Sequence, residues 1–177
     1  MTYRRDLWEV AAQQHGVFTL DDADAADVPA VEVRKMAARG ALRRYGQGVY
    51  VHLGTPQTRL TEPAVAVALG GKDAFLERES VFDLLGIGQF NPRKIRVGTT
   101  HRVRRTLPEW IGLENRADIR AEDVTAYEGI PSTHIRKAFE DMLPRMPRER
   151  WEALLGEAID HELVEATEAA RLRGLAA

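Results

Sequence analysis

Two runs of basic residues without any acid are the part of this 177-residue sequence whose residue types point most directly to a chemistry. The first run extends from Val33 to Leu60 and the second from Arg93 to Arg105. Arginine and lysine donate hydrogen bonds to phosphate oxygens and to the acceptor edge of guanine. Because the whole chain has a net charge of −2, these runs predict two local anion-binding surfaces. Two solvated faces without a ligand are the alternative interpretation.

Motifs of enzymes and metal sites are incomplete in this sequence. The stretch from Gly70 to Asp73 lacks the leading glycine and the Ser/Thr of a phosphate-binding P-loop. His161-Glu162 lacks the second histidine of a zinc-protease pair, and the chain has no cysteine. The five histidines are scattered and no nucleophile stands beside a base. We therefore expect no enzyme activity, no metal site and no cofactor.

The first acid-free run begins on a segment, about residues 29–39, that is expected to form a recognition helix. At 100° per residue, Val33, Met36 and Ala37 share one face, which would pack on a core. Long donors on the opposite face can reach guanine, and a valine there can contact a thymine methyl group. The residues of this outer face are Val31, Arg34, Lys35, Ala38 and Arg39. A solvated face of an ordinary helix is the alternative.

A β-hairpin is predicted directly after this helix. Its strands would cover residues 42–45 and 49–53, separated by the turn Gly46-Gln47-Gly48. Such a hairpin can act as a wing that lays cationic side chains and turn amides along phosphates or in the minor groove. Tyr50 is expected in the core. The predicted DNA-contacting residues of helix and wing are Val31, Arg34, Lys35, Arg39, Arg43, Arg44 and Gln47.

Two helical segments before the recognition helix complete the layout of the first domain. The first is expected over residues 4–14, and the second begins at Thr19, where Thr-x-x-Asp is typical of a capped helix start. The residue before Pro29 avoids helical geometry, so the second helix ends there. Three short helices followed by a hairpin predict a winged helix-turn-helix DNA-binding domain over residues 1–54.

The polar segment 54–58 predicts a domain boundary, after which residues 60–177 form a small mixed α/β domain with a helical C-terminal tail. Strands are expected at residues 75–76, 94–98, 112–114 and 124–127. Helices are expected at residues 62–69, from a Ser80 cap to Leu85, from Ser132 or Thr133 onward, over 151–159, and from about Val164. The whole chain is therefore expected to have an α+β fold.

The distribution of apolar residues also predicts where the protein acts. No run approaches the roughly 18 apolar residues that a membrane helix needs. The first ten residues carry charge and no apolar run, so we expect no secretory signal. The sequence therefore predicts a soluble, cytoplasmic protein without a membrane partner.

Several segments resemble the AbiEi-type antitoxins of type IV toxin–antitoxin systems. In the first half these segments are residues 15–23 (HGVFTLDDA), 33–42 (VRKMAARGAL) and 46–50 (GQGVY), which resemble the family's winged helix. In the second half, residues 80–87, 92–97, 129–133 and 137–141 are similar to its C-terminal domain. The resemblance covers roughly residues 15–165. Lys137 and Ala138 replace the family's usual Arg-Thr, but Lys137 can still pair with Asp141 across one helical turn.

The resemblance implies two roles for the protein. Members neutralise a nucleotidyltransferase toxin encoded alongside, without forming a stable complex with it, and their C-terminal domain is needed for this. The winged helix binds inverted repeats in the promoter of its own operon and represses it. If the antitoxic action engages a nucleic acid or a nucleotide, the second basic run is the predicted surface, with Arg93, Lys94, Arg96, Arg102, Arg104 and Arg105.

Two alternatives stay open at this point. The protein could be a winged-helix transcriptional regulator whose second domain binds a ligand or mediates assembly, with no toxin partner. It could also be an enzyme with a DNA-targeting domain, although no convergent polar site supports this. A nucleotidyltransferase reading frame next to the gene would favour the antitoxin over the simple regulator.

Overall fold

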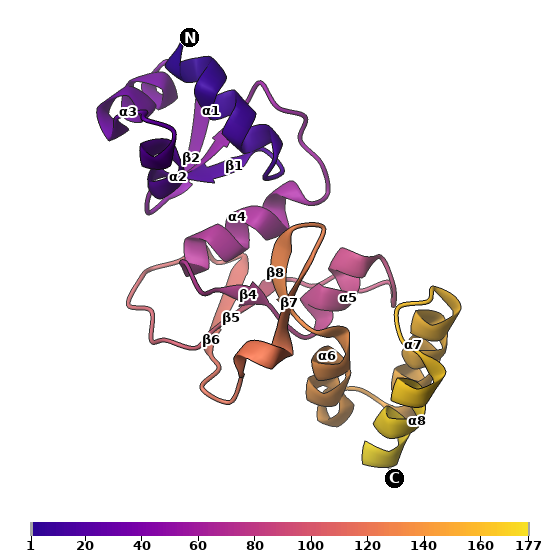
Figure 1. Ribbon diagram of the computed structural model, residues 1–177. Coiled ribbons are helices and arrows are strands. Elements are labelled where there is room, and N and C mark those ends of the chain that lie inside the picture. Colours follow the sequence, from indigo (N-terminus) through magenta and orange to yellow (C-terminus); the bar gives the residue numbers. More distant parts are fainter. Residues whose placement is uncertain (1, 177) are drawn as a thin grey trace. The chain divides into compact units, whose positions relative to one another are not determined.

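The computed structural model describes residues 2–176 and divides into two compact units, Met1–Lys72 and Asp73–Ala177 (Figure 1). The first unit has the element order of a winged helix-turn-helix, as predicted, followed by one further helix. Its elements are α1 (Tyr3–Ala12), β1 (Val17–Thr19), α2 (Leu20–Ala25), α3 (Ala30–Ala38), β2 (Leu42–Gly46), β3 (Val49–His52) and α4 (Thr61–Gly70). The short strand β1 was not expected, and it pairs with β3 to complete a three-stranded antiparallel sheet of order β1-β3-β2.

Local sequence signals fix the ends of the helices in the first unit. The Thr19 side chain accepts a hydrogen bond from the Asp22 N–H, and the Asp22 carboxylate accepts one from the Thr19 N–H. This is the predicted capping box. Pro29 is the N-cap of α3, where its missing N–H costs nothing. Gly40 follows α3 with a φ of 78°, a left-handed conformation that favours glycine and turns the chain into β2.

The core of the first unit lies between the helices and one face of the sheet. Leu7 of α1, Phe18 of β1 and Val33 of α3 are fully buried there. The Phe18 and Tyr50 rings stack with centroids 5.8 Å apart, which confirms the prediction that Tyr50 is a core residue. Packing of α1 and α3 on this face fixes the direction in which the outer face of α3 points.

Helix α4 covers the other face of the same sheet. Val17, Val49 and Val51 are buried but alternate with the residues of the helical core, so they point to the opposite face. Helix α4 packs on all three strands there, on the side of the sheet that faces away from α1, α2 and α3 (Figure 1). The first compact unit therefore extends past the predicted boundary between residues 54 and 60. The assignment of residues 1–54 and 60–177 to two separate domains stays a prediction.

A buried histidine joins the end of β3 to α1. His52 is 1% exposed, and its Nε2 lies 3.2 Å from the Arg4 carbonyl oxygen. Its Nδ1 accepts a hydrogen bond from the Gly54 N–H at 3.0 Å. Burial lowers the pKa of His52. The neutral imidazole with its proton on Nε2 satisfies both contacts.

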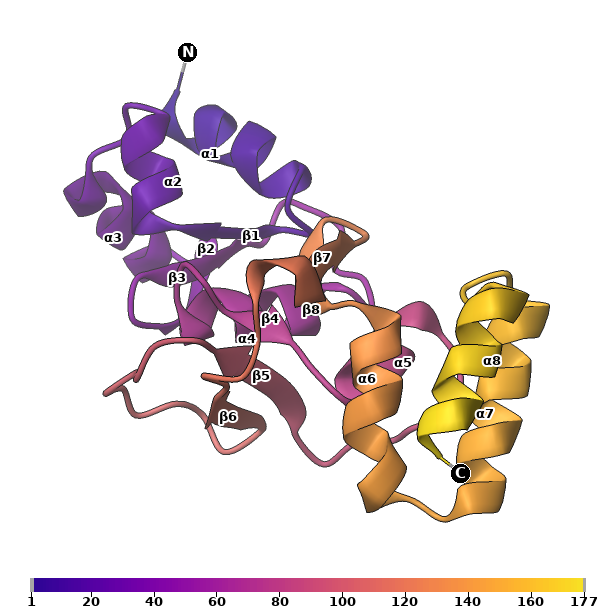
Figure 2. The same cartoon turned by 60° about the horizontal axis from the view of Figure 1, so that its bottom comes forward.

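The second unit contains a mixed five-stranded sheet with helices beside it (Figure 2). Its strands are β4 (Phe75–Leu76), β5 (Ile95–Thr99), β6 (Ile111–Asn115), β7 (Val124–Tyr127) and β8 (Ile130–Thr133), in the order β6-β5-β4-β8-β7. The β4/β8 and β5/β6 pairs are parallel, and the β4/β5 and β7/β8 pairs are antiparallel. Strands β4 to β7 confirm the expected ones.

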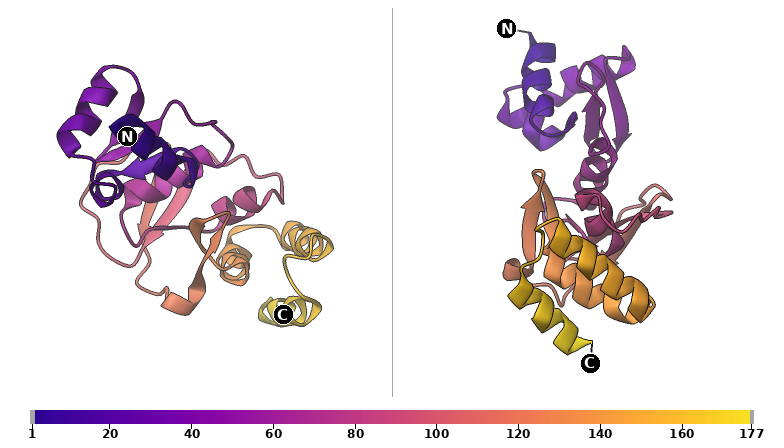
Figure 3. Two further views of the ribbon diagram at one scale, coloured as in Figure 1. Left: turned by 45° about the horizontal axis from the view of Figure 1, so that its top comes forward. Right: turned by 90° about the vertical axis from the view of Figure 1, so that its right-hand side faces the viewer.

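Helices form the rest of the second unit. They are α5 (Glu79–Leu85), α6 (Ile135–Met142), α7 (Arg148–Asp160) and α8 (Ala166–Leu175), with short 3-10 turns η1 (Ala121–Asp123) and η2 (Leu143–Arg145). Helices α6, α7 and α8 pack on one another (Figure 3), which confirms the predicted helical tail. Trp151 of α7 packs edge-on against Phe139 of α6, and its Nε1 donates to the Phe139 carbonyl oxygen at 2.9 Å.

Two predicted helix starts in the second unit were wrong. Ser132 and Thr133 belong to strand β8, and α6 begins at Ile135 with His134 as its N-cap. Ser80 lies inside α5, and its Oγ accepts the Arg96 N–H from strand β5 at 2.8 Å. The Ser80 hydroxyl thus binds strand β5, whereas Ser132 and Thr133 are held extended by the pairing of β8 with β4 and β7. No helix in residues 2–176 is both long and apolar enough to span a bilayer.

Candidate nucleic-acid interface

Helix α3 presents the predicted residues on its outer face. Val33 is fully buried, while Met36 and Ala37 are half-buried against the core. Arg34, Lys35 and the helix C-cap Arg39 are exposed. The core therefore holds α3 by one side and leaves the opposite side open for a ligand.

An exposed apolar side chain marks the middle of this outer face. Val31 is 52% exposed, and Lys35 and Ala38 follow it at helical spacing. A valine gains nothing from contact with water, but it can contact a thymine methyl group in the major groove. Beside it, Lys35 can donate to guanine, and the small Ala38 lets the helix backbone come close.

The wing is a tight hairpin at the edge of the sheet. Gln47 and Gly48 form its turn with φ values of 38° and 76°, and two residues with positive φ are typical of a type I′ hairpin turn. Strand β2 is the edge strand, so Arg43 and Arg44 are both exposed. Gln47 is exposed at the tip.

The two wing arginines point to opposite faces of the hairpin. Arg44 pairs in register with Tyr50, whose ring lies on the helical side of the sheet. Arg43 pairs with Val51, which faces the α4 side. From the sequence, both arginines were predicted to contact DNA. The register with β3 places only Arg44 on the same side of the sheet as α3.

Most cations of this surface have no carboxylate partner. Among residues 2–176, no carboxylate forms an ion pair with Arg34, Arg39, Arg43 or Arg44. Lys35 is the exception, because its Nζ lies 2.7 Å from the Glu32 Oε1. We call the surface made by α3 and the wing the α3–wing surface. Its unpaired guanidinium groups are available to phosphates.

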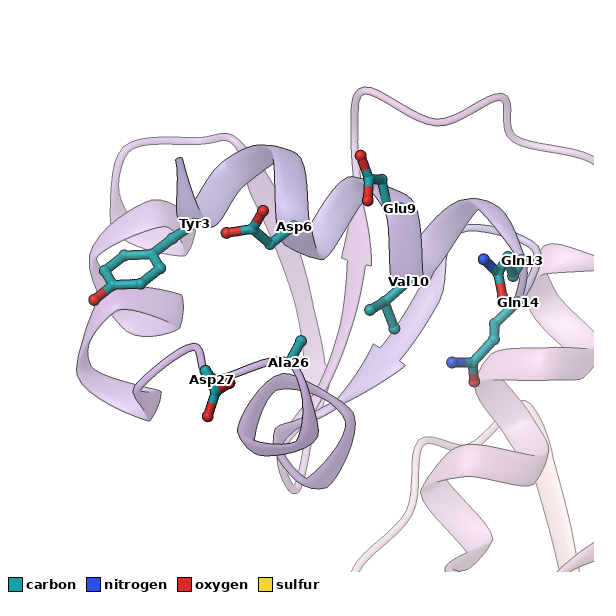
Figure 4. A pocket seen from close by; sticks show the side chains of 8 residues that line it. All are labelled: Tyr3, Asp6, Glu9, Val10, Gln13, Gln14, Ala26 and Asp27. Carbon is teal, nitrogen blue, oxygen red and sulfur yellow. The ribbon is translucent and has the colours of Figure 1, made fainter. Parts of the chain in front are cut away.

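A groove of about 570 Å³ lies between α1 and the turn that follows α2 (Figure 4). Asp6, Glu9 and Asp27 line it together with the apolar side chains of Val10 and Ala26. Carboxylates repel phosphates, so this groove is not part of a DNA surface. The first unit therefore carries an acidic groove as well as the cationic α3–wing surface.

The residues of the second basic run lie in three places in the structure: before β5, on β5 and in the loop after β5. Arg93 and Lys94 are exposed before β5, and Arg102, Arg104 and Arg105 are exposed in the loop that joins β5 to β6. Arg96 lies on β5, and its Nε contacts the Glu79 Oε1 at 2.9 Å. Glu79 therefore neutralises Arg96, which is also half-buried, while the other five cations of the predicted antitoxin surface are exposed.

A buried ionic network in the second unit was missed by the sequence analysis. Arg116, 6% exposed, forms ion pairs with Glu77, Asp118 at 2.8 Å and Asp141 at 2.9 Å. Lys137 contacts Asp141 at 3.2 Å, which confirms the predicted pair. In the sequence, only the place of Glu77 directly after the apolar residues Ala74 to Leu76 could have indicated a buried carboxylate. We call it the Arg116 network.

The Arg116 network shifts the protonation of its members. The hydrogen bond from Arg116 lowers the pKa of Asp118 to about 2. Burial raises the pKa of Glu77, although Arg78 and Arg116 oppose this. Because its cations are matched by carboxylates, the network offers no net positive charge to an anion. Within residues 2–176, no group of three His, Asp or Glu side chains could hold a metal ion.

The match to a known family falls on the first unit. Residues 5–51 match a family model described as a transcriptional regulator, AbiEi antitoxin. This segment is similar to the regulator domain of the AbiEi antitoxins. It runs from α1 to β3 and so includes the whole α3–wing surface, which confirms the resemblance of the N-terminal segments. The resemblance of residues 80–141 stays a prediction, and no curated protein matches the chain.

Proposed function

We propose that this protein is an antitoxin of a type IV toxin–antitoxin pair, which neutralises a nucleotidyltransferase toxin and represses its own operon. The observation that carries the proposal is the α3–wing surface, where four arginines have no carboxylate partner among residues 2–176, within a segment that matches the AbiEi regulator family. Bound phosphates would release the counterions and stabilise the complex.

In the repressor role, α3 enters the major groove with Val31, Arg34 and Lys35 toward the base edges. Arg39 follows α3, and Arg44 and Gln47 of the wing contact the adjacent phosphates. Arg43, on the other face of the hairpin, is the weakest of the predicted DNA contacts. One winged helix reads only a few base pairs, so useful specificity requires two copies on an inverted repeat in the promoter.

In the antitoxin role, the second unit acts through its exposed cations. Arg93, Lys94, Arg102, Arg104 and Arg105 would contact a nucleic acid or a nucleotide that the toxin also uses. Arg96 stabilises strand β5 against helix α5 through its ion pair with Glu79, and it is not expected to contact the ligand. The toxin is a functional partner without a stable complex, both roles belong to the cytoplasm, and neither requires an enzyme activity.

A second candidate function is a winged-helix transcriptional regulator without a toxin partner. The family match ends at residue 51 and leaves the second unit outside it. In this alternative the second unit binds a ligand or mediates assembly. DNA binding by the α3–wing surface is common to both functions.

Co-expression with the adjacent reading frame tests the antitoxin role. Growth should stop when that reading frame is expressed alone and return when the full chain is added. The triple variant R102A/R104A/R105A should lose the rescue while its affinity for promoter DNA stays within a few-fold of wild type. Full rescue by the triple variant would exclude the proposed antitoxin surface, and an adjacent frame that is not toxic would favour the regulator.

A further inference from the structure

Helix α3 carries one acidic residue on a surface that is otherwise cationic. Glu32 lies in the first turn, and its Oε1 accepts a hydrogen bond from the Lys35 Nζ at 2.7 Å. The Glu32 side chain is 31% exposed and that of Lys35 is 53% exposed. Glu32 lies seven residues before Arg39, so the two occupy the same flank of the outer face.

A carboxylate at this place opposes general DNA binding. It repels phosphates and lowers the charge that Lys35 offers to them. An acid in the first turn also stabilises the helix slightly through the helix dipole, but an acid at any other position of the first turn would do the same. Helix stability therefore does not by itself explain a carboxylate at this position, which borders the outer face of α3.

The Glu32–Lys35 pair is complementary to the major-groove edge of a G·C base pair. The ion pair holds a hydrogen-bond acceptor directly beside a donor. In the major groove, guanine presents the acceptors N7 and O6, and its cytosine presents the N4 donor next to them. Lysine donates to guanine and glutamate accepts from the cytosine N4. One ion pair can thus contact both bases.

We propose that Glu32 is a specificity-determining residue, which acts with Lys35 to select a G·C base pair and to weaken binding to other sequences. This inference rests on the proposed role of α3 as the recognition helix. At a G·C pair the carboxylate receives a hydrogen bond that compensates for its repulsion from phosphates. At an A·T pair the order is reversed: adenine presents the N6 donor where guanine has the O6 acceptor, and thymine presents the O4 acceptor where cytosine has the N4 donor. Lys35 then meets a donor and Glu32 meets an acceptor, so both contacts are lost.

The test uses the full chain and a pool of duplexes with a randomised central segment. Wild type and E32Q each select duplexes from the pool, and sequencing gives the base preference at every position. The affinities of the best wild-type duplex and of its G·C-to-A·T variants are then measured at one salt concentration. E9Q is the matched control, because it removes the carboxylate of the exposed Arg5–Glu9 pair on α1, off the α3–wing surface.

Wild type is expected to prefer G·C at one position by on the order of tenfold. E32Q should lose most of this preference and bind the A·T variant more tightly than wild type does, while E9Q leaves both affinities unchanged. An E32Q preference equal to that of wild type, in a variant that melts at the wild-type temperature, would overturn the inference. A second variant, E32A, checks that the glutamine amide does not substitute for the carboxylate. If wild type itself selects no sequence, the proposed function fails instead.

Discussion

The arginines of the α3–wing surface in the first unit and Arg116 in the second unit are used in opposite ways. In the first unit, Arg34, Arg39, Arg43 and Arg44 are exposed and have no carboxylate partner among the described residues. In the second unit, Arg116 is buried and contacts three carboxylates. An unpaired exposed charge adds little to folding and is available to a ligand, whereas a buried paired charge is needed once the fold has enclosed its partners. The state of pairing therefore separates a binding surface from a structural network.

The largest expected effect concerns the limits of the first unit. A fragment of residues 1–60 lacks α4 and exposes the face of the sheet that carries Val17, Val49 and Val51. Three buried valines contribute on the order of 5 kcal/mol, which is comparable to the whole stability of a small domain. Residues 1–72 should show a cooperative thermal transition by circular dichroism and residues 1–60 should not. Equal transitions in the two fragments would show that α4 is dispensable.

The Arg116 network gives the next largest effect. R116A removes the nearest counter-charge of the buried Glu77 and one of the two counter-charges of Asp141, so the free energy of unfolding should fall by about 3–5 kcal/mol. R102A, which removes an exposed arginine of the same unit, should change it by less than about 0.5 kcal/mol. Urea denaturation of both variants measures the difference. A small effect of R116A would contradict the structural role of the network.

The α3–wing surface should show the reverse pattern. R34A should leave the melting temperature unchanged but weaken binding to the selected duplex by about 1–3 kcal/mol, if Arg34 contacts a base. R44A should weaken binding to all duplexes and reduce the slope of log affinity against log salt by about one. R43A is the matched control on the other face of the hairpin, with a smaller change in slope. Equal slopes for R43A and R44A would show that both faces of the wing contact DNA.

The smallest effect is a pH dependence within the first unit. The pKa of His52 is lowered by burial, so the unfolded chain binds a proton at a higher pH than the folded one does. Its contribution to stability is present above the unfolded pKa of about 6.5 and is lost as the pH falls through the folded pKa. H52Q should therefore lose less stability than wild type between pH 7.5 and pH 5. The difference isolates His52 from His134, whose pKa is also lowered by burial. An unchanged pH dependence in H52Q would contradict the assignment.

The sequence predicted those features of the fold that depend on neighbouring residues. The capping box at Thr19, the turn at Gln47-Gly48 and the outer face of α3 follow from local spacing, and the structure has all three. The opposite directions of Arg43 and Arg44 depend on the register with β3, and the cover of the sheet by α4 depends on packing. Neither is visible in local spacing.

The features of the second unit that the sequence did not predict also depend on contacts between distant parts of the chain. Strand β8 was mistaken for a helix start because Ser132 and Thr133 are good caps, and only pairing with β4 and β7 makes them extended. Glu77, Arg116 and Asp141 are far apart in the sequence and meet only in the folded chain. The direct DNA contacts and the antitoxin surface stay predictions, which the experiments above address.

The cover that α4 provides has a consequence for how such domains are inherited. The family match ends at residue 51, before α4 begins at Thr61. A gene segment that ends there encodes a complete α3 and wing but leaves one side of the sheet bare. Any recombination event that transfers this segment to another gene must therefore join it to a sequence with a suitable apolar helix. The junction with the recipient protein is then under selection for packing, even though the DNA-contacting residues lie elsewhere.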